Sequence, residues 1–201
     1  MPPAPPSARP PVRQRLAWWV SVLAHPFVLI PLLVGYVTAR SLPTGQAAMV
    51  VGIVVAGAIL PMLWIISRRV RSGAWTNYDV SVREQRTGMY PAALAIAGVT
   101  VLVLAWARSP RPVLLGAVGS LLLIVASSLV NLRLKVSLHV GFAAFAAVAV
   151  LPDRTLSAGL GLVALAVAWS RLELGRHSVA EVVGGALLGV AVGMAVVMWA
   201  G

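Results

Sequence analysis

The sequence contains no cysteine, only five acidic residues and only three histidines among 201 residues. The absence of cysteine excludes disulfide bonds, thiolate nucleophiles and cysteine-ligated metal sites. Charged residues make up 10% of the chain and hydrophobic residues 60%, whereas soluble domains contain roughly 25% charged residues. This composition excludes an ordinary soluble domain and indicates a protein of the lipid bilayer.

Several apolar runs approach the length of about 20 residues that a helix needs to cross a bilayer. They cover residues 16–39, 47–66, 91–107, 113–130, 138–152, 156–170 and 179–200. The run 138–152 is short and could instead be a tilted or partly re-entrant helix. We expect an all-α fold, a polytopic transmembrane bundle of six to seven helices, with seven preferred.

The chain divides into a tail and one membrane domain. Residues 1–15 are rich in proline and are expected to form a disordered cytoplasmic tail, and residues 16–201 form the membrane domain. A cleavable signal peptide is the alternative, but the run from Leu16 is too long for one and lacks a small-residue cleavage site. The first helix is therefore expected to be retained and to bend at His25-Pro26 and at Pro31.

The net charge of +11 is distributed unevenly between the two sides of the membrane. If the N-terminus is inside, the inner side receives Arg9, Arg13, Arg15, Arg68, Arg69, Arg71, Arg83, Arg86, Arg133, Lys135, Arg171 and Arg176. The outer side receives Arg40, Arg108, Arg111 and Arg154. This bias predicts a multi-pass protein of the plasma (inner) membrane with a cytoplasmic N-terminus. Because topology accounts for the basic charge, we expect membrane lipids as partners and no nucleic acid.

Three polar clusters, at residues 83–91, 135–141 and 170–181, fall on the same side because two crossings separate each from the next. Together they offer guanidinium and ammonium groups, hydroxyls, two histidines and a carboxylate. Basic donors suit a tetrahedral phosphate, and two histidines can supply a nucleophile and a proton donor. No metal-ligand motif is present, so neither a metal site nor another cofactor is expected.

Local spacing adds expectations within two clusters. Asp79 and Arg83 have helical spacing and are expected to form an ion pair. Lys135, Ser137 and His139 alternate with apolar residues, so an extended strand would point all three the same way. Ser137 could also cap the helix that follows, whose free N–H groups would form an anion site.

The third cluster carries a resemblance. Ser170-Arg171, five residues, His177, three residues and Glu181 resemble the third signature of the type 2 phosphatidic acid phosphatase family, Ser-Arg-x5-His-x3-Asp. That family consists of membrane-bound lipid phosphatases. The resemblance covers roughly residues 47–200.

The other two clusters are similar to the remaining signatures. Residues 135–141 resemble the second signature, Pro-Ser-Gly-His, through Ser137 and His139, with Leu138 in place of the glycine. The first signature, Lys-x6-Arg-Pro, falls on Arg83 and on Tyr90 with its following proline, so a tyrosine stands where the family has arginine.

The resemblance implies a role for each matched residue. His177 would be the nucleophile that forms a phosphohistidine, Glu181, in place of the usual aspartate, would orient it, and His139 would protonate the leaving alcohol. Arg86 has no counterpart but could replace the arginine missing at Tyr90. The phosphoryl oxygens would be held by Arg83, Lys135, Ser137, Ser170 and Arg171.

A structural explanation of the third cluster remains open. Ser178-Val-Ala-Glu181 is a capping box at the start of an apolar helix and accounts for Glu181 without catalysis. Arg171 and Arg176 would then serve only to set topology.

The function expected from these observations is hydrolysis of a lipid phosphate monoester at the cytoplasmic membrane boundary, without a metal. A phosphatidate-type or polyprenyl-linked phosphate is the expected substrate, with its tail in the bilayer. Two alternatives stay open: a lipid phosphotransferase, and a non-catalytic lipid-binding or transport protein with the same fold.

Overall fold

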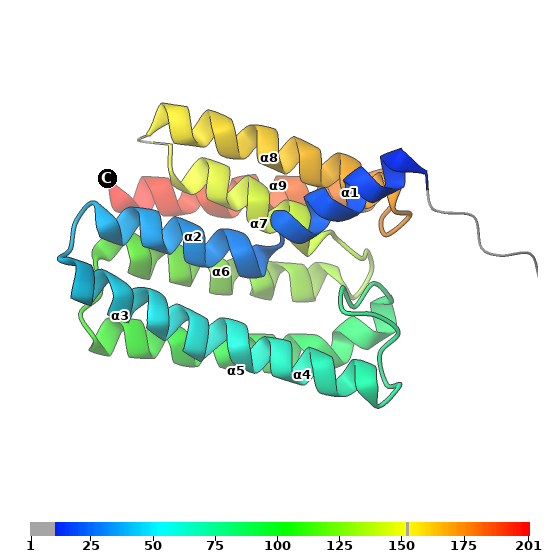
Figure 1. Ribbon diagram of the computed structural model, residues 1–201, viewed down its shortest axis with the longest axis horizontal. Coiled ribbons are helices and arrows are strands. Elements are labelled where there is room, and N and C mark those ends of the chain that lie inside the picture. The colour runs from blue at the N-terminus through cyan, green and yellow to red at the C-terminus, as the bar shows by residue number, and fades with distance from the viewer. Residues whose placement is uncertain (1–10, 152) are drawn as a thin grey trace, which may run out of the picture.

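The computed structural model describes residues 11–151 and 153–201, and all regular secondary structure in these residues is helical. A π-helical segment, η1 (Val55–Ile59), joins α3 to α4. The α-helices are α1 (Val12–Leu23), α2 (Pro26–Ala39), α3 (Thr44–Val54), α4 (Leu60–Arg71), α5 (Arg83–Trp106), α6 (Arg111–Val130), α7 (Leu138–Ala149), α8 (Arg154–Glu173) and α9 (Val179–Ala200) (Figure 1). The expectation of an all-α bundle is confirmed.

Five helices of the described chain are long and apolar enough to cross a membrane: the continuous helix Thr44–Arg71, α5, α6, α8 and α9. A sixth span arises if α1 and α2, which bend by 47° at their junction, are taken together. The helix α7 has 12 residues, fewer than the roughly 20 that a full crossing needs. These long apolar helices fit an integral membrane protein, and α7 is short as the sequence suggested.

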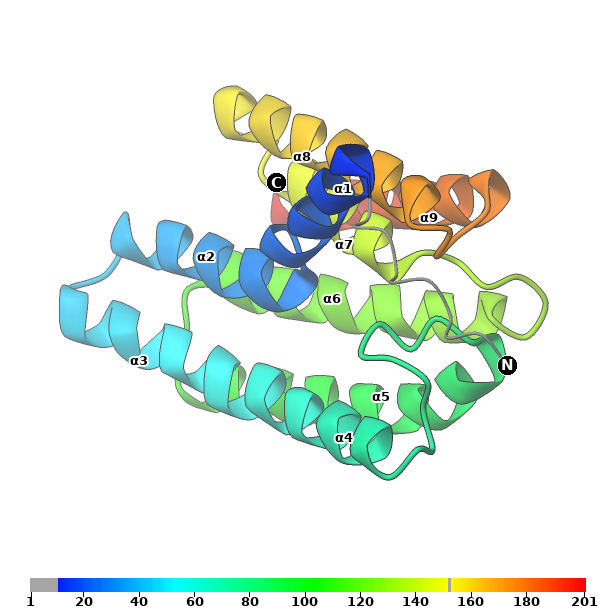
Figure 2. The ribbon, with the colours of Figure 1, turned by 45° about the vertical axis from the view of Figure 1, so that its right-hand side comes forward.

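The first span bends at only one of the two expected places. The helix breaks before Pro26, and the Nδ1 atom of His25 accepts the backbone N–H of Phe27 at 3.1 Å, which caps α2. Pro31 lies inside α2 without interrupting it, because one missing N–H leaves the surrounding helical hydrogen bonds in place. The bend at Ala24–His25 is visible between α1 and α2 in Figure 2.

Of the predicted tail, residues 1–15, the first ten lie outside the described residues. Residues 12–15 are helical and form the first turn of α1, which corrects the predicted boundary. An ion pair of 2.8 Å between Arg13 Nε and Glu173 Oε2 of α8 stabilises this turn.

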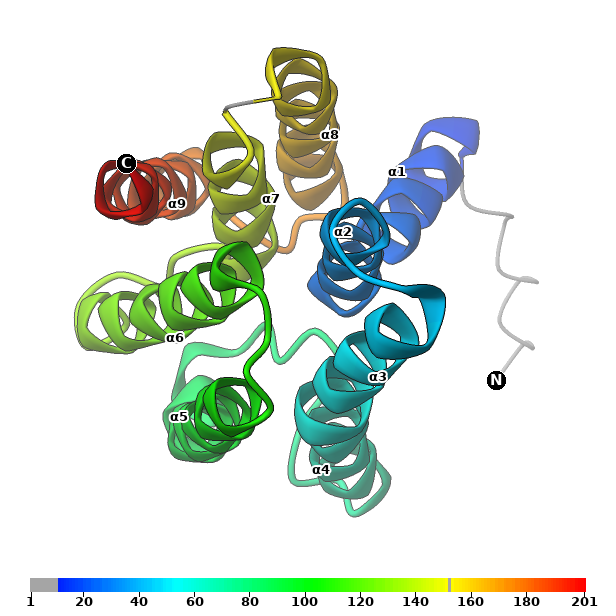
Figure 3. The ribbon, with the colours of Figure 1, turned by 90° about the vertical axis from the view of Figure 1, so that its left-hand side faces the viewer.

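A line of glycines brings α9 against α7. A Cβ atom added to Gly185 would overlap the carbonyl oxygen of Ser137, and one added to Gly189 would overlap that of Gly141. Small residues at this spacing let two membrane helices approach at their backbones. In Figure 3, α7 lies inside the bundle, where it contacts α2, α6, α8 and α9. The contact fixes the first turn of α7 beside the first turn of α9, and the Ser137 N–H donates to the Glu181 carbonyl at 2.9 Å.

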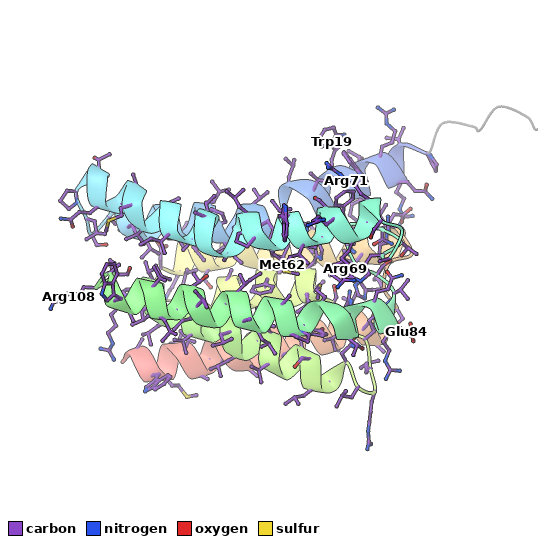
Figure 4. The ribbon with its side chains drawn as sticks, turned by 90° about the horizontal axis from the view of Figure 1, so that it is seen from below. Trp19, Met62, Arg69, Arg71, Glu84 and Arg108 are labelled. Atoms are coloured by element: carbon purple, nitrogen blue, oxygen red, sulfur yellow. The ribbon has the colours of Figure 1, made fainter. Side chains whose placement is uncertain are left out.

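The loops 72–82, 131–137 and 174–178 lie together at one end of the bundle, on the right of Figure 1. We call this end the polar end. Figure 4 shows Arg69, Arg71 and Glu84 there and Arg108 at the opposite end. The structure therefore brings the three polar clusters to one end of the bundle, as the sequence predicted.

Candidate functional site

The residues of the third cluster are placed by two helix ends. The helix α8 ends at Glu173, and Gly175 follows with φ of +61°, a left-handed conformation that glycine adopts without strain. Ser178 then caps α9, so His177 lies one residue before the cap and Glu181 lies in the first turn. The His177 Nδ1 and Glu181 Oε2 atoms are 2.8 Å apart.

The protonation of His177 follows from its two neighbours. A carboxylate only accepts hydrogen bonds, so Nδ1 carries the proton that it donates to Glu181. The other ring atom, Nε2, faces Arg86 Nη2 at 3.4 Å, and a guanidinium only donates. Burial, reinforced by the charge of Arg86, holds the pKa of His177 well below its usual 6.5 although Glu181 opposes this shift. The neutral imidazole therefore has its lone pair on Nε2.

A single oxygen of Glu181 serves several donors. Besides His177, Oε2 accepts the backbone N–H of Ser178 at 3.2 Å and lies 3.3 Å from Lys135 Nζ. The Ser178 hydroxyl accepts the Glu181 N–H at 3.3 Å, which completes the capping box. The structural and the chemical interpretations of Glu181 therefore coexist in one geometry.

The first cluster contributes Arg86 to this site, whereas Arg83 lies apart from it. Arg86 is buried, with 2% of its surface exposed, and donates to the carbonyl oxygens of Val80 at 2.8 Å and Val136 at 2.6 Å. The exposed Arg83 donates instead to the carbonyl oxygens of residues 131 and 132. Tyr90, one turn beyond Arg86, is buried and its hydroxyl has no hydrogen-bond partner among the described residues.

The fully buried Arg171 forms the second half of the site with Asp79. Its Nη2 atom lies 2.9 Å from Asp79 Oδ2, and its Nη1 atom donates to Ser21 Oγ at 2.6 Å. The same Asp79 oxygen is 3.9 Å from Arg176 Nε. The expected pair between Asp79 and Arg83 is absent from these contacts, because α5 begins only at Arg83 and Asp79 has no helical register with it.

Asp79 is held in place by an unusual backbone. The next residue, Val80, is buried and has φ of +45°. A β-branched residue in this region is strained, and such strain persists only where surrounding contacts impose it. Because the Val80 carbonyl accepts from Arg86, residues 79 and 80 connect the Arg171 half of the site to the His177 half.

His139 lies in the first turn of α7, next to Asp79. Its Nε2 atom is buried, is 3.8 Å from Asp79 Oδ1 and has no hydrogen-bond partner in the described chain. The ring of His25 packs edge-on against it, with centroids 4.5 Å apart. Of the two conformations considered for residues 135–139, the structure contains the helix, because α7 begins at Leu138. Ser137 is the N-cap residue, but its buried hydroxyl makes no capping bond.

Ser170 reaches the interior without offering its hydroxyl to the site. It is fully buried, and its Oγ donates to the Val167 carbonyl at 2.8 Å inside α8. The structure thus gathers Arg86, Lys135, His139, Arg171, His177 and Glu181, which we call the polar cluster, together with Asp79.

Three side chains in or next to the polar cluster could together ligate a metal ion, which the sequence did not indicate. Ligand atoms of His25, Asp79 and His139 lie within 4.8 Å of one another. A divalent cation there would compete with the Arg171 guanidinium, which already holds Asp79 at 2.9 Å. Since Arg86, Arg171, Arg176 and Lys135 surround only two carboxylates, the charge balance of the site favours an anion over a cation.

The residues that sequence reasoning missed are Asp79 and His25. Asp79 is one of five acids in the chain, and this scarcity was the available signal. His25 gave none, because it meets His139 only through the bend between α1 and α2.

Comparison of the chain with family models, curated proteins and solved structures finds no match. The fold and its apolar helices define the class, an integral membrane protein.

Proposed function

We propose that the protein is a membrane phosphatase that hydrolyses a lipid phosphate monoester through a phosphohistidine at His177. The observation that carries this proposal is the fixed tautomer of His177. Glu181 accepts the Nδ1 proton at 2.8 Å, and the lone pair on Nε2 points toward a guanidinium that would attract a phosphate. Neither a metal nor another cofactor is part of the proposal.

The chemistry takes place in two steps that the cluster can balance. The Nε2 lone pair of His177 attacks phosphorus, and the bond from phosphorus to the ester oxygen breaks. The departing alcohol takes a proton from the imidazolium form of His139, which becomes neutral. Water then gives a proton back to His139 and attacks the phosphohistidine, which releases phosphate and restores His177. Glu181 stabilises the positive charge that the ring develops in both steps.

The basic residues would hold the phosphate. Arg86 and Arg171 present planar donors suited to phosphoryl oxygens, and Lys135 adds an ammonium group. Asp79 already pairs with Arg171, so an incoming phosphate has to displace that carboxylate or bind beside it.

The orientation of the protein is part of the proposal. The excess of arginine and lysine in the loops of the polar end supports a cytoplasmic location for that end. A cytoplasmic site points to lipid intermediates made inside the cell, such as phosphatidate-type or polyprenyl-linked phosphates.

Cysteine labelling in intact cells tests this orientation. A cysteine at Ser41, an exposed residue between α2 and α3, should react with an impermeant thiol reagent, and one at the exposed Ser72 after α4 should not. Reaction at position 72 with protection at 41 would place the site on the outer face.

A second candidate, a non-catalytic lipid-binding protein, is favoured by one observation. The Arg171 guanidinium is already paired with Asp79 and the His177 Nε2 atom faces Arg86, so these two groups have partners without a substrate. A phosphotransferase would use the same first step and differ only in the acceptor.

A phosphate-release assay separates these functions. The purified protein is screened against phosphatidate, phosphatidylglycerol phosphate and polyprenyl phosphates, with and without EDTA. We expect release that survives EDTA, is inhibited by vanadate and disappears in His177→Ala. Phosphate transfer to an added alcohol without release into water would indicate a phosphotransferase. The absence of turnover with any of these lipids would favour a non-catalytic lipid-binding protein.

A further inference from the structure

A partly open apolar cavity of about 270 Å³ lies between the helices of the bundle. Its walls come from α2, the continuous helix α3–η1–α4, α5, α6 and α7. Ligand pockets in proteins are typically about 300–1,000 Å³, so this cavity is slightly smaller than the lower limit of that range. A space of this size holds one slender ligand rather than a bulky one.

The cavity extends along most of the length of α5. One face of this helix lines it, through Arg86, Tyr90, Ala93, Ala97, Thr100 and Leu104. Arg86 and Leu104 are eighteen residues apart, which corresponds to about 27 Å at a rise of 1.5 Å per residue. One leaflet of a bilayer is roughly 15 Å thick, half of a hydrocarbon core of about 30 Å. The cavity is therefore long enough for a lipid tail.

The polarity of the lining changes from one end to the other. His25, Asp79, Arg86 and His139 line the end next to the polar cluster. Tyr90, whose hydroxyl has no partner among the described residues, follows one turn along α5. Beyond it the polar side chains of the lining are Thr100 and Ser120, and both hydroxyls donate to carbonyl groups of their own helices at 2.8 Å. The deep part of the cavity thus offers no free donor to a polar ligand and is suited to hydrocarbon.

We propose that this cavity binds the tail of a single-chain lipid whose anionic headgroup lies in the polar cluster. Charge complementarity selects the headgroup, because Arg86 lines the mouth of the apolar part and Arg171 pairs with Asp79, another lining residue. The tail is then enclosed by the bundle and is not left in the surrounding bilayer. The identity of the headgroup rests on the proposed function, whereas the position of the tail rests on the cavity alone.

Photocrosslinking locates the tail. The full-length protein in nanodiscs is irradiated with hexadecyl phosphate that carries a diazirine at the end of its chain, and the modified residues are mapped by mass spectrometry. We expect labelling of Ala97, Thr100 and Leu104 on the cavity face of α5, suppressed by excess unlabelled hexadecyl phosphate. Labelling confined to Val99 and Leu102, which are 58% and 70% exposed on the outer face of the same helix, would overturn the proposal.

A pair of matched variants tests the depth of the tail. Ala97→Leu adds three carbons inside the cavity halfway along α5, and Ala95→Leu adds the same carbons on the exposed face. Labelling at Thr100 and Leu104 should be lost in Ala97→Leu and kept in Ala95→Leu. Equal labelling in both variants would contradict the proposal, and the map of the unmodified protein remains decisive if Ala97→Leu fails to fold.

Two further readouts separate this inference from the phosphatase proposal. Labelling of the cavity without phosphate release would support the cavity and refute the phosphatase. Phosphate release with labelling only at Val99 and Leu102 would do the reverse. Competition by hexadecanol as strong as that by hexadecyl phosphate would refute the selection of an anionic headgroup.

Discussion

Replacing Glu181 with glutamine distinguishes its proposed catalytic role, orienting His177, from its structural role as a cap of α9. Glutamine keeps the shape of the side chain and can still accept the Ser178 N–H, so the capping box survives. It removes the negative charge of Glu181, whose Oε2 atom lies 2.8 Å from His177 Nδ1 and 3.3 Å from Lys135 Nζ. The variant should fold normally and turn over substrate slowly.

The size of the loss follows from these contacts. A hydrogen bond to a charged group contributes about 1.5–3 kcal/mol, and about 1.4 kcal/mol changes a rate tenfold. Losing the charge on one such contact in the transition state should slow turnover by about 10–100-fold. Losing it on both should slow turnover by about 10²–10⁴-fold, a range whose upper end equals the effect of the orienting carboxylate in a catalytic triad. We expect a loss of at least about a hundredfold.

The assay is phosphate release from the lipid phosphate that the unmodified protein hydrolyses best, with thermal unfolding as the check on folding. Glu84→Gln is the matched control, because Glu84 is an exposed acid in the first turn of α5 and lies outside the polar cluster. Normal turnover in Glu181→Gln together with inactivity of His177→Ala would refute the reasoning and leave Glu181 as a helix cap only.

Three further predictions concern charge, packing and pH. Asp79→Asn keeps an acceptor for Arg171 but removes the competing anion, so vanadate should inhibit at about tenfold lower concentration; an unchanged inhibition constant would show that Asp79 does not compete. Gly189→Ala should lower the thermal midpoint by a destabilisation of about 1–3 kcal/mol, because its Cβ would overlap the Gly141 carbonyl, whereas Gly98→Ala has no atom within 4 Å of the added Cβ and should not lower it. Because the pKa of His177 is depressed in the folded protein, the unfolded chain binds more protons than the folded one below about pH 6.5. The free energy of unfolding should therefore fall as pH decreases below that value, and should fall less in His177→Asn. Identical pH profiles of the two proteins would contradict this.

Much of the fold could be predicted because a bilayer makes hydropathy and helix length informative. The apolar runs located the spans, the two crossings between successive polar clusters placed all three at one end, and the short run at 138–152 indicated an atypical helix. The spacing of Ser178 and Glu181 predicted a capping box, which the structure contains. Each of these features depends on residues close together in the chain.

The parts that could not be predicted depend on contacts between distant segments. Helical spacing suggested that Asp79 pairs with Arg83, but the chain leaves the helix at that point and Asp79 reaches Arg171 instead. Arg83 and Arg86 differ by only one turn, and the packing of α5 against the loop at Val136 decides which of them is buried. A sequence pattern records neither the burial nor the loop conformation.

The most direct test of the central claim is to look for phosphate on His177 itself. The protein is mixed with its lipid phosphate, quenched in base, where phosphohistidine is stable, and digested for mass spectrometry. The account predicts a phosphate on the peptide that contains His177, formed within the time of a single turnover and absent from His177→Ala. Steady hydrolysis with no phosphate on that peptide, or hydrolysis that persists in His177→Ala, would contradict it.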